Sequence, residues 1–315
     1  MTVVSIIQNA NVDLAVKEAI DLVGGIERFI HPNEKVVIKP NLVLALPSDT
    51  GMTTDPRVIQ AIIELCRSVN PSDVIIAEGS GGIDTKIAFD RCGYSKLASR
   101  WGVKLVDLNK SETTMVDVPE GRALQVLNVP NVIIESDVLI NVPKLKFFER
   151  WASLSIKNLI GAVPGKGEYS QTLSPDFPLK LSGAYCTPEG RFFGPRGEKK
   201  KVHEDLAEGL VDLNMIIKPS LNLIDGIIAC YGDRPLRTKE KPIELNTILA
   251  GEDPLAVDCV ATKISELNPL DIPYMKCAAE RGLGESDYNR IQVLGTPLLK
   301  IAKAWKTELT NLNCI

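Results

Sequence analysis

Lysine, amide and carboxylate side chains follow several short apolar runs of this sequence, at the points where those runs end. Because ligands of an open α/β sheet bind beyond the carboxyl ends of its strands, we expect these side chains to gather at one edge of a sheet. Lysine and amide groups at such an edge donate hydrogen bonds to anions, and a carboxylate beside them is able to move a proton. The pattern therefore predicts a site for a small anionic metabolite. Its strand-end residues are Lys39, Asn41, Glu78, Ser80, Gly81, Lys144, Lys146 and Asp225.

An enzyme is the favoured interpretation of this site. Glu78 or His203 is the expected acid/base group, and Asp225 or Asp258 is the expected orienting carboxylate. Asp258 stands among apolar neighbours of a predicted helix, where an unpaired charge is costly, so it requires a partner or a ligand. A non-catalytic module that binds an anion or a redox partner is the alternative. The expected anion donors are Lys39, Asn41, Lys144, Lys146, Lys157 and Asn158.

Two glycine-rich stretches invite comparison with phosphate-binding loops. A Walker loop requires G-x-x-x-x-G-K-[ST] directly after a strand. The stretch "GAVPGKGEYS" at 161–170 has only three residues between its first glycines and Gly167 in place of the hydroxyl residue, so it is not such a loop. Lys166, within this stretch, is either a further donor to a basic site or part of a mobile, solvated loop. The stretch "EGSGG" at 78–82 is either a plain turn or an anion cradle ahead of a helix that begins near Ile83.

The sequence has few histidines, and its cysteines do not form the patterns that bind metals. His31 precedes a turn proline and is expected at the surface, whereas His203 lies in the first turn of a predicted helix over 201–218, either as a core-edge residue or as an acid/base group. Seven cysteines without a C-x-x-C pair indicate reduced, mostly buried thiols. We therefore predict no zinc or iron centre, and the sequence identifies no cofactor. An oxygen-ligand site at Glu78, Asp225 or Asp258 has weak support.

Strand-length apolar runs alternate with helical patterns along the chain. The runs are rich in β-branched residues and lack polar alternation, as is typical of strands that are buried on both faces. Helices that begin after Asp55 and Asp253 have an acidic cap and a proline in the first turn. The alternation predicts an α/β fold with a mostly parallel sheet covered by helices. Residues 113–129 are predicted to form an inserted hairpin.

Residues 161–201 are rich in glycine, proline and charge, and they are too long for a simple connection. The prediction is a single α/β domain over 1–315, with the option of two lobes, 1–150 and 202–295, joined by this insertion. Its aromatic side chains require burial, so it is either a lid over the site or an arm that packs on a second subunit. We favour the arm, and hence a homodimer.

Composition excludes several classes of protein. The 315 residues have a formal charge of −4 and a pI near 5.5, which argues against a general nucleic-acid binder. Apolar runs fall short of the roughly 20 residues that cross a bilayer, and the first residues do not resemble a secretory leader. We therefore expect a cytoplasmic protein with no nucleic-acid or membrane partner.

The sequence resembles the family known as domain of unknown function 362 over about residues 36–295. The motifs that carry the likeness are "VVIKPNLV", "TTDPRVIQAIIEL", "LINVPKLK", "SIKNLIGAVP", "VHEDLAEGLVDLN", "LNLIDGI", "GEDPLAVDCVATKI" and "RGLGE". Many relatives have an appended four-iron ferredoxin segment, which implies a separate redox partner for this chain, since it has no such cysteine cluster. Phe147 and Phe148 stand where relatives commonly have Thr-His. "TTDPRVIQAIIEL" is also similar to part of the nickel-dependent lactate racemases, although their nickel-pincer histidine pattern is not evident.

Overall fold

Most strands of the protein belong to one ten-stranded sheet. The computed structural model describes residues 1–148, 151–165, 197–232, 241–312 and 314. The sheet has the strand order β12-β1-β11-β10-β7-β2-β3-β4, and β8 pairs with β10 and β9 beside this path. The strands are β1 (Thr2–Gln8), β2 (Lys35–Lys39), β3 (Asp73–Glu78), β4 (Lys104–Asp107), β7 (Val138–Asn141), β8 (Lys144–Phe148), β9 (Trp151–Ser153), β10 (Leu221–Gly232), β11 (Lys241–Gly251) and β12 (Ile291–Gly295).

Parallel pairing prevails in this sheet. β2 lies between β3 and β7 and is parallel to both, and in this register Lys39 is opposite Asn141. The exceptions are β11, which pairs antiparallel with both β1 and β10, and β9, which pairs antiparallel with β8. The predicted α/β fold with a mostly parallel sheet is confirmed. The carboxyl ends of β2, β3 and β7 consequently meet at one edge.

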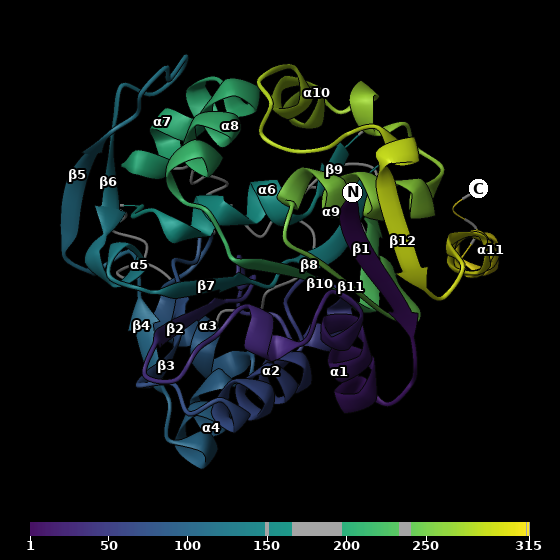
Figure 1. The fold of residues 1–315 in the computed structure, drawn as a ribbon, viewed down its shortest axis with the longest axis horizontal. Coiled ribbons are helices and arrows are strands. Elements are labelled where there is room, and N and C mark those ends of the chain that lie inside the picture. The colour runs from purple at the N-terminus through teal and green to yellow at the C-terminus, as the bar shows by residue number, and fades with distance from the viewer. Residues whose placement is uncertain (149–150, 166–196, 233–240, 313, 315) are drawn as a thin grey trace, which may run out of the picture.

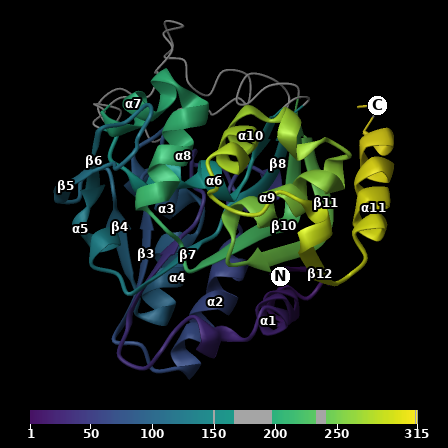
Figure 2. The same cartoon turned by 45° about the horizontal axis from the view of Figure 1, so that its top comes forward.

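Helices cover both faces of the sheet (Figure 1). α1, α2 and α4 lie on one side and α6, α8, α9 and α10 on the other, and the turned view keeps this separation (Figure 2). The helices are α1 (Val12–Leu22), α2 (Pro56–Ser68), α3 (Thr85–Arg91), α4 (Tyr94–Trp101), α5 (Asn131–Ile134), α6 (Ser155–Asn158), α7 (Glu198–Glu204), α8 (Leu206–Ile216), α9 (Pro254–Thr262), α10 (Pro273–Glu280) and α11 (Leu298–Asn311).

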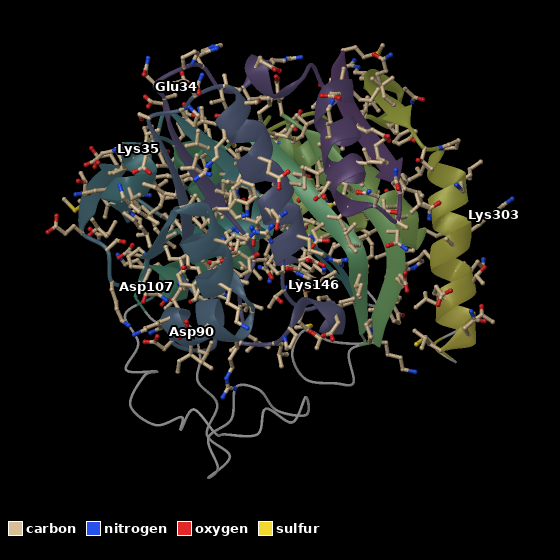
Figure 3. All side chains as sticks on the ribbon, turned by 90° about the horizontal axis from the view of Figure 1, so that it is seen from below. Glu34, Lys35, Asp90, Asp107, Lys146 and Lys303 are labelled. Atoms are coloured by element: carbon tan, nitrogen blue, oxygen red, sulfur yellow. The ribbon has the colours of Figure 1, made fainter. Side chains whose placement is uncertain are left out.

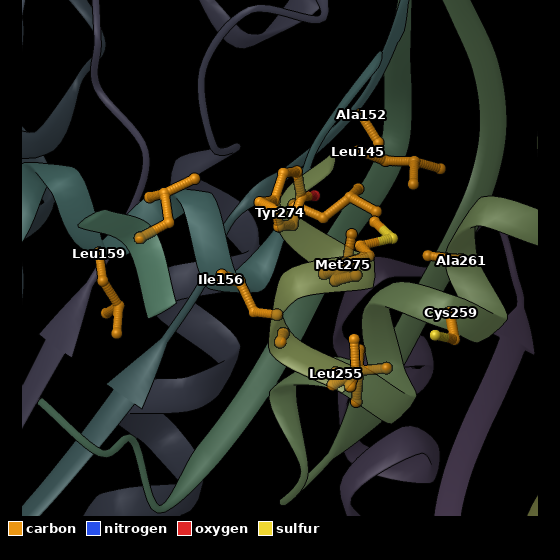
Figure 4. Packing of buried hydrophobic residues seen from close by; sticks show 14 of the residues in the cluster. Leu145, Ala152, Ile156, Leu159, Leu255, Cys259, Ala261, Tyr274 and Met275 are labelled. Atoms are coloured by element: carbon orange, nitrogen blue, oxygen red, sulfur yellow. The ribbon is translucent and has the colours of Figure 1, made fainter. Parts of the chain in front are cut away.

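The two layers of helices enclose separate apolar clusters, one on each face of the sheet. In one of them, Tyr274 and Met275 of α10 pack near Leu145 of β8, and Ile156 of α6 lies near Leu255 of α9 (Figure 4). Full burial of one such side chain contributes roughly 1.5–3 kcal/mol to folding. The clusters therefore fix α6, β8 and α9, the elements that surround the candidate site.

Both predicted acidic caps are present. The Asp55 carboxylate accepts from the N–H of Arg57 at the start of α2, and Pro56 occupies the first turn. Asp253 accepts from the N–H groups of Leu255 and Ala256 at the start of α9. These side chains satisfy N–H groups that have no partner within the helix, so each helix begins where the sequence predicts.

The predicted hairpin is also present, as strands β5 (Thr113–Asp117) and β6 (Val126–Pro130). The two strands are antiparallel, with Thr113 opposite Pro130, and they form a separate sheet. Asp212 of α8 accepts from the N–H groups of Ala123 and Leu124 just before β6. The hairpin is therefore tied to the helical layer rather than to the main sheet.

One predicted helix is wrong. Residues 201–218 do not form one helix, because Asp205 adopts an extended conformation (φ −131°, ψ 91°) and its side chain caps α8 instead. His203 consequently lies in the last turn of α7, not in a first turn. The helix after the "EGSGG" stretch begins at Thr85 with Asp84 as its cap, close to the predicted start near Ile83.

Three further expectations concern the cysteines, the segment 161–201 and membrane-spanning helices. Five of the six described cysteines are buried, Cys314 is half-buried, and none forms a disulfide with another described cysteine. Most of the segment 161–201, including Lys166 and Cys186, lies outside the described residues. Of the helices in the described ranges, none is long and apolar enough to span a membrane.

Candidate functional site

The side chain of Lys39 forms a buried ion pair with Glu78 at the carboxyl ends of β2 and β3. Its Nζ lies 3.2 Å from Oε1 and 3.0 Å from Oε2, and neither side chain is more than 3% exposed. The carboxylate also accepts from the N–H of Leu42 at 3.1 Å and of Gly79 at 2.8 Å. Glu78 is thus engaged on both oxygens, and its surroundings suit a partner for Lys39 better than a free acid/base group.

Gly161 closes over this ion pair. A Cβ atom at Gly161 would lie 2.2 Å from Oε1 of Glu78 and 2.6 Å from Nζ of Lys39. The carbonyl of Gly161 accepts from the N–H of Gly79 at 3.0 Å, which fixes this close approach. Gly161 is therefore present because the backbone must pass against a buried ion pair, and not because it binds phosphate.

A second buried ion pair joins Lys144 and Asp225. The Lys144 Nζ lies 2.9 Å from Oδ2 of Asp225, and both side chains are inaccessible to solvent. The same carboxylate accepts from the N–H of Asp55 at 2.7 Å and of Ile227 at 3.0 Å. Lys144 and Lys146 follow the end of β7, as predicted, but they belong to the next strand, β8. Asp225, which the sequence predicts after the end of a strand, lies within β10. The carboxylate of Asp225 therefore has structural partners, namely Lys144 and two backbone N–H groups.

A chain of asparagine side chains connects Lys146 with the centre of the sheet. Asn41 Nδ2 donates to Oδ1 of Asn158 at 2.8 Å, and Asn158 Nδ2 donates to Oδ1 of Asn141 at 2.8 Å. Asn141 Nδ2 donates in turn to Oδ1 of Asn222 at 2.9 Å. Each amide oxygen faces the Lys146 end of the chain. Aligned hydrogen bonds polarise one another, so the chain strengthens Oδ1 of Asn41 as an acceptor.

Backbone carbonyls fix the orientation of these amides. A carbonyl only accepts, so the amide atom that faces it must be the nitrogen, which settles the assignment of oxygen and nitrogen. Three amides of the chain have such a partner. The contacts are Asn158 with Pro40 at 3.3 Å, Asn141 with Ser155 at 3.0 Å and Asn222 with Glu252 at 3.0 Å.

Lys146 heads the asparagine chain, and its ammonium has only neutral partners. Its Nζ donates to Oδ1 of Asn41 at 2.6 Å and to the carbonyl of Met52 at 3.0 Å, and the residue is 3% exposed. Among the described residues no carboxylate forms a salt bridge with it. Burial, followed by the positive charge of Lys157, lowers the pKa of Lys146 to about 7. Figure 3 shows Lys146 within the body of the molecule, whereas Lys303 projects from α11.

Lys157 on α6 is the second cation without a carboxylate. It is half-buried, and no described residue forms a hydrogen bond or ion pair with it. Burial lowers the pKa of Lys157 to about 8. Its neighbour Asn158 belongs to the asparagine chain, so α6 brings both residues to the same place. The sequence identifies both as donors.

Lys199 is a cation that the sequence analysis does not single out. It is 3% exposed, and its Nζ donates to Oδ1 of Asn109 at 2.5 Å. Burial lowers the pKa of Lys199 to about 7, an effect that Glu78 opposes and Lys39 reinforces. A run of three lysines at 199–201 is typical of a solvated surface, which explains why the sequence gives no sign of it.

His203 lies one turn after Lys199 on α7. Its Nδ1–H donates to the carbonyl of Lys199 at 2.6 Å, and the ring is exposed. Desolvation lowers the pKa of His203, and the positive charges of Lys157 and Lys199 act in the same direction. The ring is therefore neutral at neutral pH, with Nε2 as its unprotonated nitrogen. Its place beside the lysines is compatible with the acid/base role, which stays a prediction.

Ser80 and Asp258 make internal hydrogen bonds. Ser80 Oγ donates to the carbonyl of Val43 at 3.1 Å, and its N–H donates to Thr85 at 3.2 Å. Asp258 accepts from the N–H groups of Ser155 at 2.7 Å and Ile156 at 3.0 Å. Burial raises the pKa of Asp258 to about 7. The partner that Asp258 requires is thus the start of α6, while Gly81 has no contact in the structure that assigns it a role.

The family described as "Domain of unknown function (DUF362)" matches residues 36–263. This chain belongs to that family. The matched range contains both ion pairs, the asparagine chain, Lys146, Lys157 and Lys199. The DUF362 chain is also 24% identical, over 93% of its own length and 82% of the relative's, to the thylakoid-associated protein sll1697 of Synechocystis sp..

A solved structure resembles this DUF362 protein weakly. The lactate racemase apoprotein of Thermoanaerobacterium thermosaccharolyticum aligns with a TM-score of 0.41 and 14% identity. The alignment covers 80% of this chain and 54% of the racemase chain, so the DUF362 chain spans about half of it. Within the described ranges, no group of three or more histidine, cysteine, aspartate or glutamate side chains is placed to hold a metal ion.

Proposed function

We propose that this DUF362 protein binds a small anion, a carboxylate or a phosphate, at the carboxyl ends of β2 and β7. Lys146 and Lys157 supply the positive charge, and Asn41 supplies an amide donor. The proposal is supported above all by one observation: Lys146 is buried and Lys157 is half-buried, yet neither has a carboxylate partner among the described residues. A buried charge without a partner is costly, and a bound anion offsets that cost.

Unused donors support the same place for the anion. Lys146 donates two hydrogen bonds, so the ammonium keeps one N–H, and Lys157 keeps all three. Asn41 donates one of its two amide hydrogens to Asn158 and is half-buried, so the second hydrogen is available. These groups belong to different elements, β8, α6 and the loop after β2, and a ligand between them would be held from several sides.

Two other lysines, Lys39 and Lys144, are not expected to bind the anion, because each forms a buried ion pair. Lys39 and Lys144 are each neutralised by a carboxylate, Glu78 and Asp225 respectively, so they hold the fold at the strand ends. Lys199 retains a neutral partner and is a further source of positive potential. We extend the proposal to catalysis: His203 acts as the acid/base group in turnover of the bound anion. A cytoplasmic location, a homodimer and a separate redox partner stay predictions from the sequence.

Isothermal titration calorimetry tests the proposal. Inorganic phosphate and succinate are titrated into the wild-type protein and into Lys157→Gln, with Lys303→Gln as the control, since Lys303 is an exposed lysine of α11. We expect a saturable binding isotherm for at least one of the anions. A hydrogen bond from a charged group is worth about 1.5–3 kcal/mol, so Lys157→Gln should weaken binding about tenfold or more.

The outcome separates the two kinds of anion as well. Binding of phosphate alone identifies a phosphorylated ligand, and binding of succinate alone identifies a carboxylate. The proposal fails if neither anion binds the wild-type protein, or if Lys303→Gln weakens binding as much as Lys157→Gln does.

A further inference from the structure

We infer that Lys146 is a nucleophile that forms an imine with an aldehyde or ketone group of the bound anion. The inference rests on the proposed function, because it places the carbonyl compound on Lys157. It deepens that function by naming the substrate class, a small anion that also has a reactive carbonyl group, such as a 2-oxo acid or a phosphorylated aldehyde.

The contacts of Lys146 suit a neutral amine. Its two hydrogen bonds go to carbonyl-type oxygens, Oδ1 of Asn41 and the backbone oxygen of Met52, which accept but do not donate. A neutral amine has two N–H groups, so these acceptors use both and leave the lone pair directed elsewhere. A carboxylate at the same place would hold the proton on the nitrogen, and none forms a salt bridge with Lys146 within the described part of the chain.

Two features bring the ammonium and the neutral amine of Lys146 into comparable amounts at neutral pH, so that the ammonium attracts the anion and the amine reacts. Burial and the adjacent positive charge of Lys157 lower the pKa of Lys146 to about 7. At about pH 8 most of the amine is neutral, whereas an ordinary lysine is neutral to less than about 1%. A desolvated lysine beside another cation is one of the recognised ways in which proteins activate an amine nucleophile.

The asparagine chain holds the nucleophile in place. Asn41 is oriented by Asn158, and Asn158 by the carbonyl of Pro40, so Oδ1 of Asn41 cannot turn away from Lys146. Asn41, which contacts Lys146, and Lys157, whose charge acts on it, are both half-buried, so both are partly accessible to solvent.

The covalent step balances without an oxidant or a reductant. The lone pair of Nζ attacks the carbonyl carbon, a C–N bond forms, the π electrons of the carbonyl group move to its oxygen, and one proton passes from Nζ to that oxygen to give a neutral carbinolamine. A proton from solvent then lets the hydroxyl group leave as water, and the lone pair of Nζ forms the C=N bond of the protonated imine, which keeps one N–H. Asn41 accepts from this N–H, while the carbonyl of Met52 loses its donor. The reaction returns an amine and a carbonyl compound when water adds again.

Reductive trapping with pyridoxal 5′-phosphate tests the inference. The probe has an aldehyde and a phosphate, and sodium borohydride converts its imine into a stable secondary amine. Tryptic peptides are then mapped by mass spectrometry. We expect the pyridoxyl group on Lys146 at least about tenfold faster than on any exposed lysine, since the fraction of neutral amine differs by more than that. Inorganic phosphate in excess should slow the labelling of Lys146 and not that of Lys303.

Variants and a second probe separate the inference from the proposed function. Lys157→Gln should slow labelling by pyridoxal 5′-phosphate several-fold, and Lys303→Gln should leave it unchanged. Pyridoxal, which has no phosphate, should label Lys146 more slowly in the wild-type protein. The imine inference is overturned if the wild-type protein binds phosphate in the calorimeter yet Lys146 remains unlabelled, or if the label is spread over surface lysines. Labelling of Lys146 that phosphate does not slow would instead overturn the anion site.

Discussion

The ammonium of Lys39 lies 3.0 Å from Oε2 of Glu78, and both side chains are buried at the ends of adjacent parallel strands. Two carboxylate oxygens, one ammonium and the N–H groups of Leu42 and Gly79 satisfy one another there. Such a pair is strongly destabilising to break and much less so to replace as a whole. The ion pair therefore predicts how the free energy of unfolding changes in single and double variants.

We expect Glu78→Gln to lower the free energy of unfolding by about 3–5 kcal/mol, because it leaves Lys39 as an unpaired buried charge. The double variant Lys39→Met/Glu78→Gln should lose less than the sum of the two single variants. Urea denaturation of the four proteins measures this coupling. The exposed pair Lys17–Asp21 provides the control, and Asp21→Asn should cost no more than about 0.5 kcal/mol. Additive losses at Lys39 and Glu78 would contradict the ion pair.

Gly161 gives a second prediction. Its hydrogen faces Glu78 at a distance that a methyl group cannot occupy, so Gly161→Ala must displace either the backbone or the ion pair. We expect a loss of about 2 kcal/mol or more in urea denaturation. Gly81→Ala is the matched control, because the nearest atom to its added methyl is Cγ2 of Val43 at 3.8 Å, an ordinary contact. Equal effects of the two substitutions would show that Gly161 is not packed against the pair.

The sequence predicts the sheet and its main helices because their signals are local. The unbroken β-branched run at Val36–Ile38 and the Asp-Pro cap before α2 each need only a few neighbouring residues to specify an element. The break between α7 and α8 is not visible in this way. Asp205 is compatible with a helix interior by pattern, yet it leaves the helix to cap α8.

The partners within the site depend on contacts that are distant in sequence. Lys39 and Lys146 look equivalent as strand-end lysines, but among the described residues one pairs with Glu78 and the other donates to Asn41 and Met52 alone. Asn141 and Asn222 become neighbours because β7 and β10 pair in register, which no local pattern reveals. Local sequence patterns therefore identify charged residues at the strand ends but do not reveal which of them are neutralised.

The asparagine chain gives a third prediction. In Asn141→Asp an oxygen replaces the nitrogen that donates to Asn222 and to the carbonyl of Ser155, so acceptors face acceptors in a buried place. We expect a loss of about 2–4 kcal/mol in the free energy of unfolding at neutral pH. Asn311→Asp makes the same change on the exposed end of α11 and should cost about 0.5 kcal/mol or less. A tolerated Asn141→Asp would refute the assigned direction of the chain.

The lowered pKa of Lys146 gives a fourth prediction, on stability against pH. Its folded value is about 7 and its ordinary value is 10.5, so between these values the unfolded chain binds more protons than the folded one. The contribution of Lys146 to the stability of the ligand-free protein therefore rises with pH over this window, by about 2 kcal/mol between about pH 7 and pH 9.

Urea denaturation of wild-type protein, Lys146→Met and Lys303→Met at about pH 7, 8 and 9 tests this prediction. The Lys303→Met curve should rise in parallel with the wild-type curve, because Lys303 is exposed. The Lys146→Met curve should rise less steeply, by roughly 1 kcal/mol per pH unit. Anion binding should follow the opposite course and weaken over the same range, because the cation that attracts the anion is lost. Parallel curves for all three proteins would mean that Lys146 keeps an ordinary pKa, and that its amine is protonated throughout.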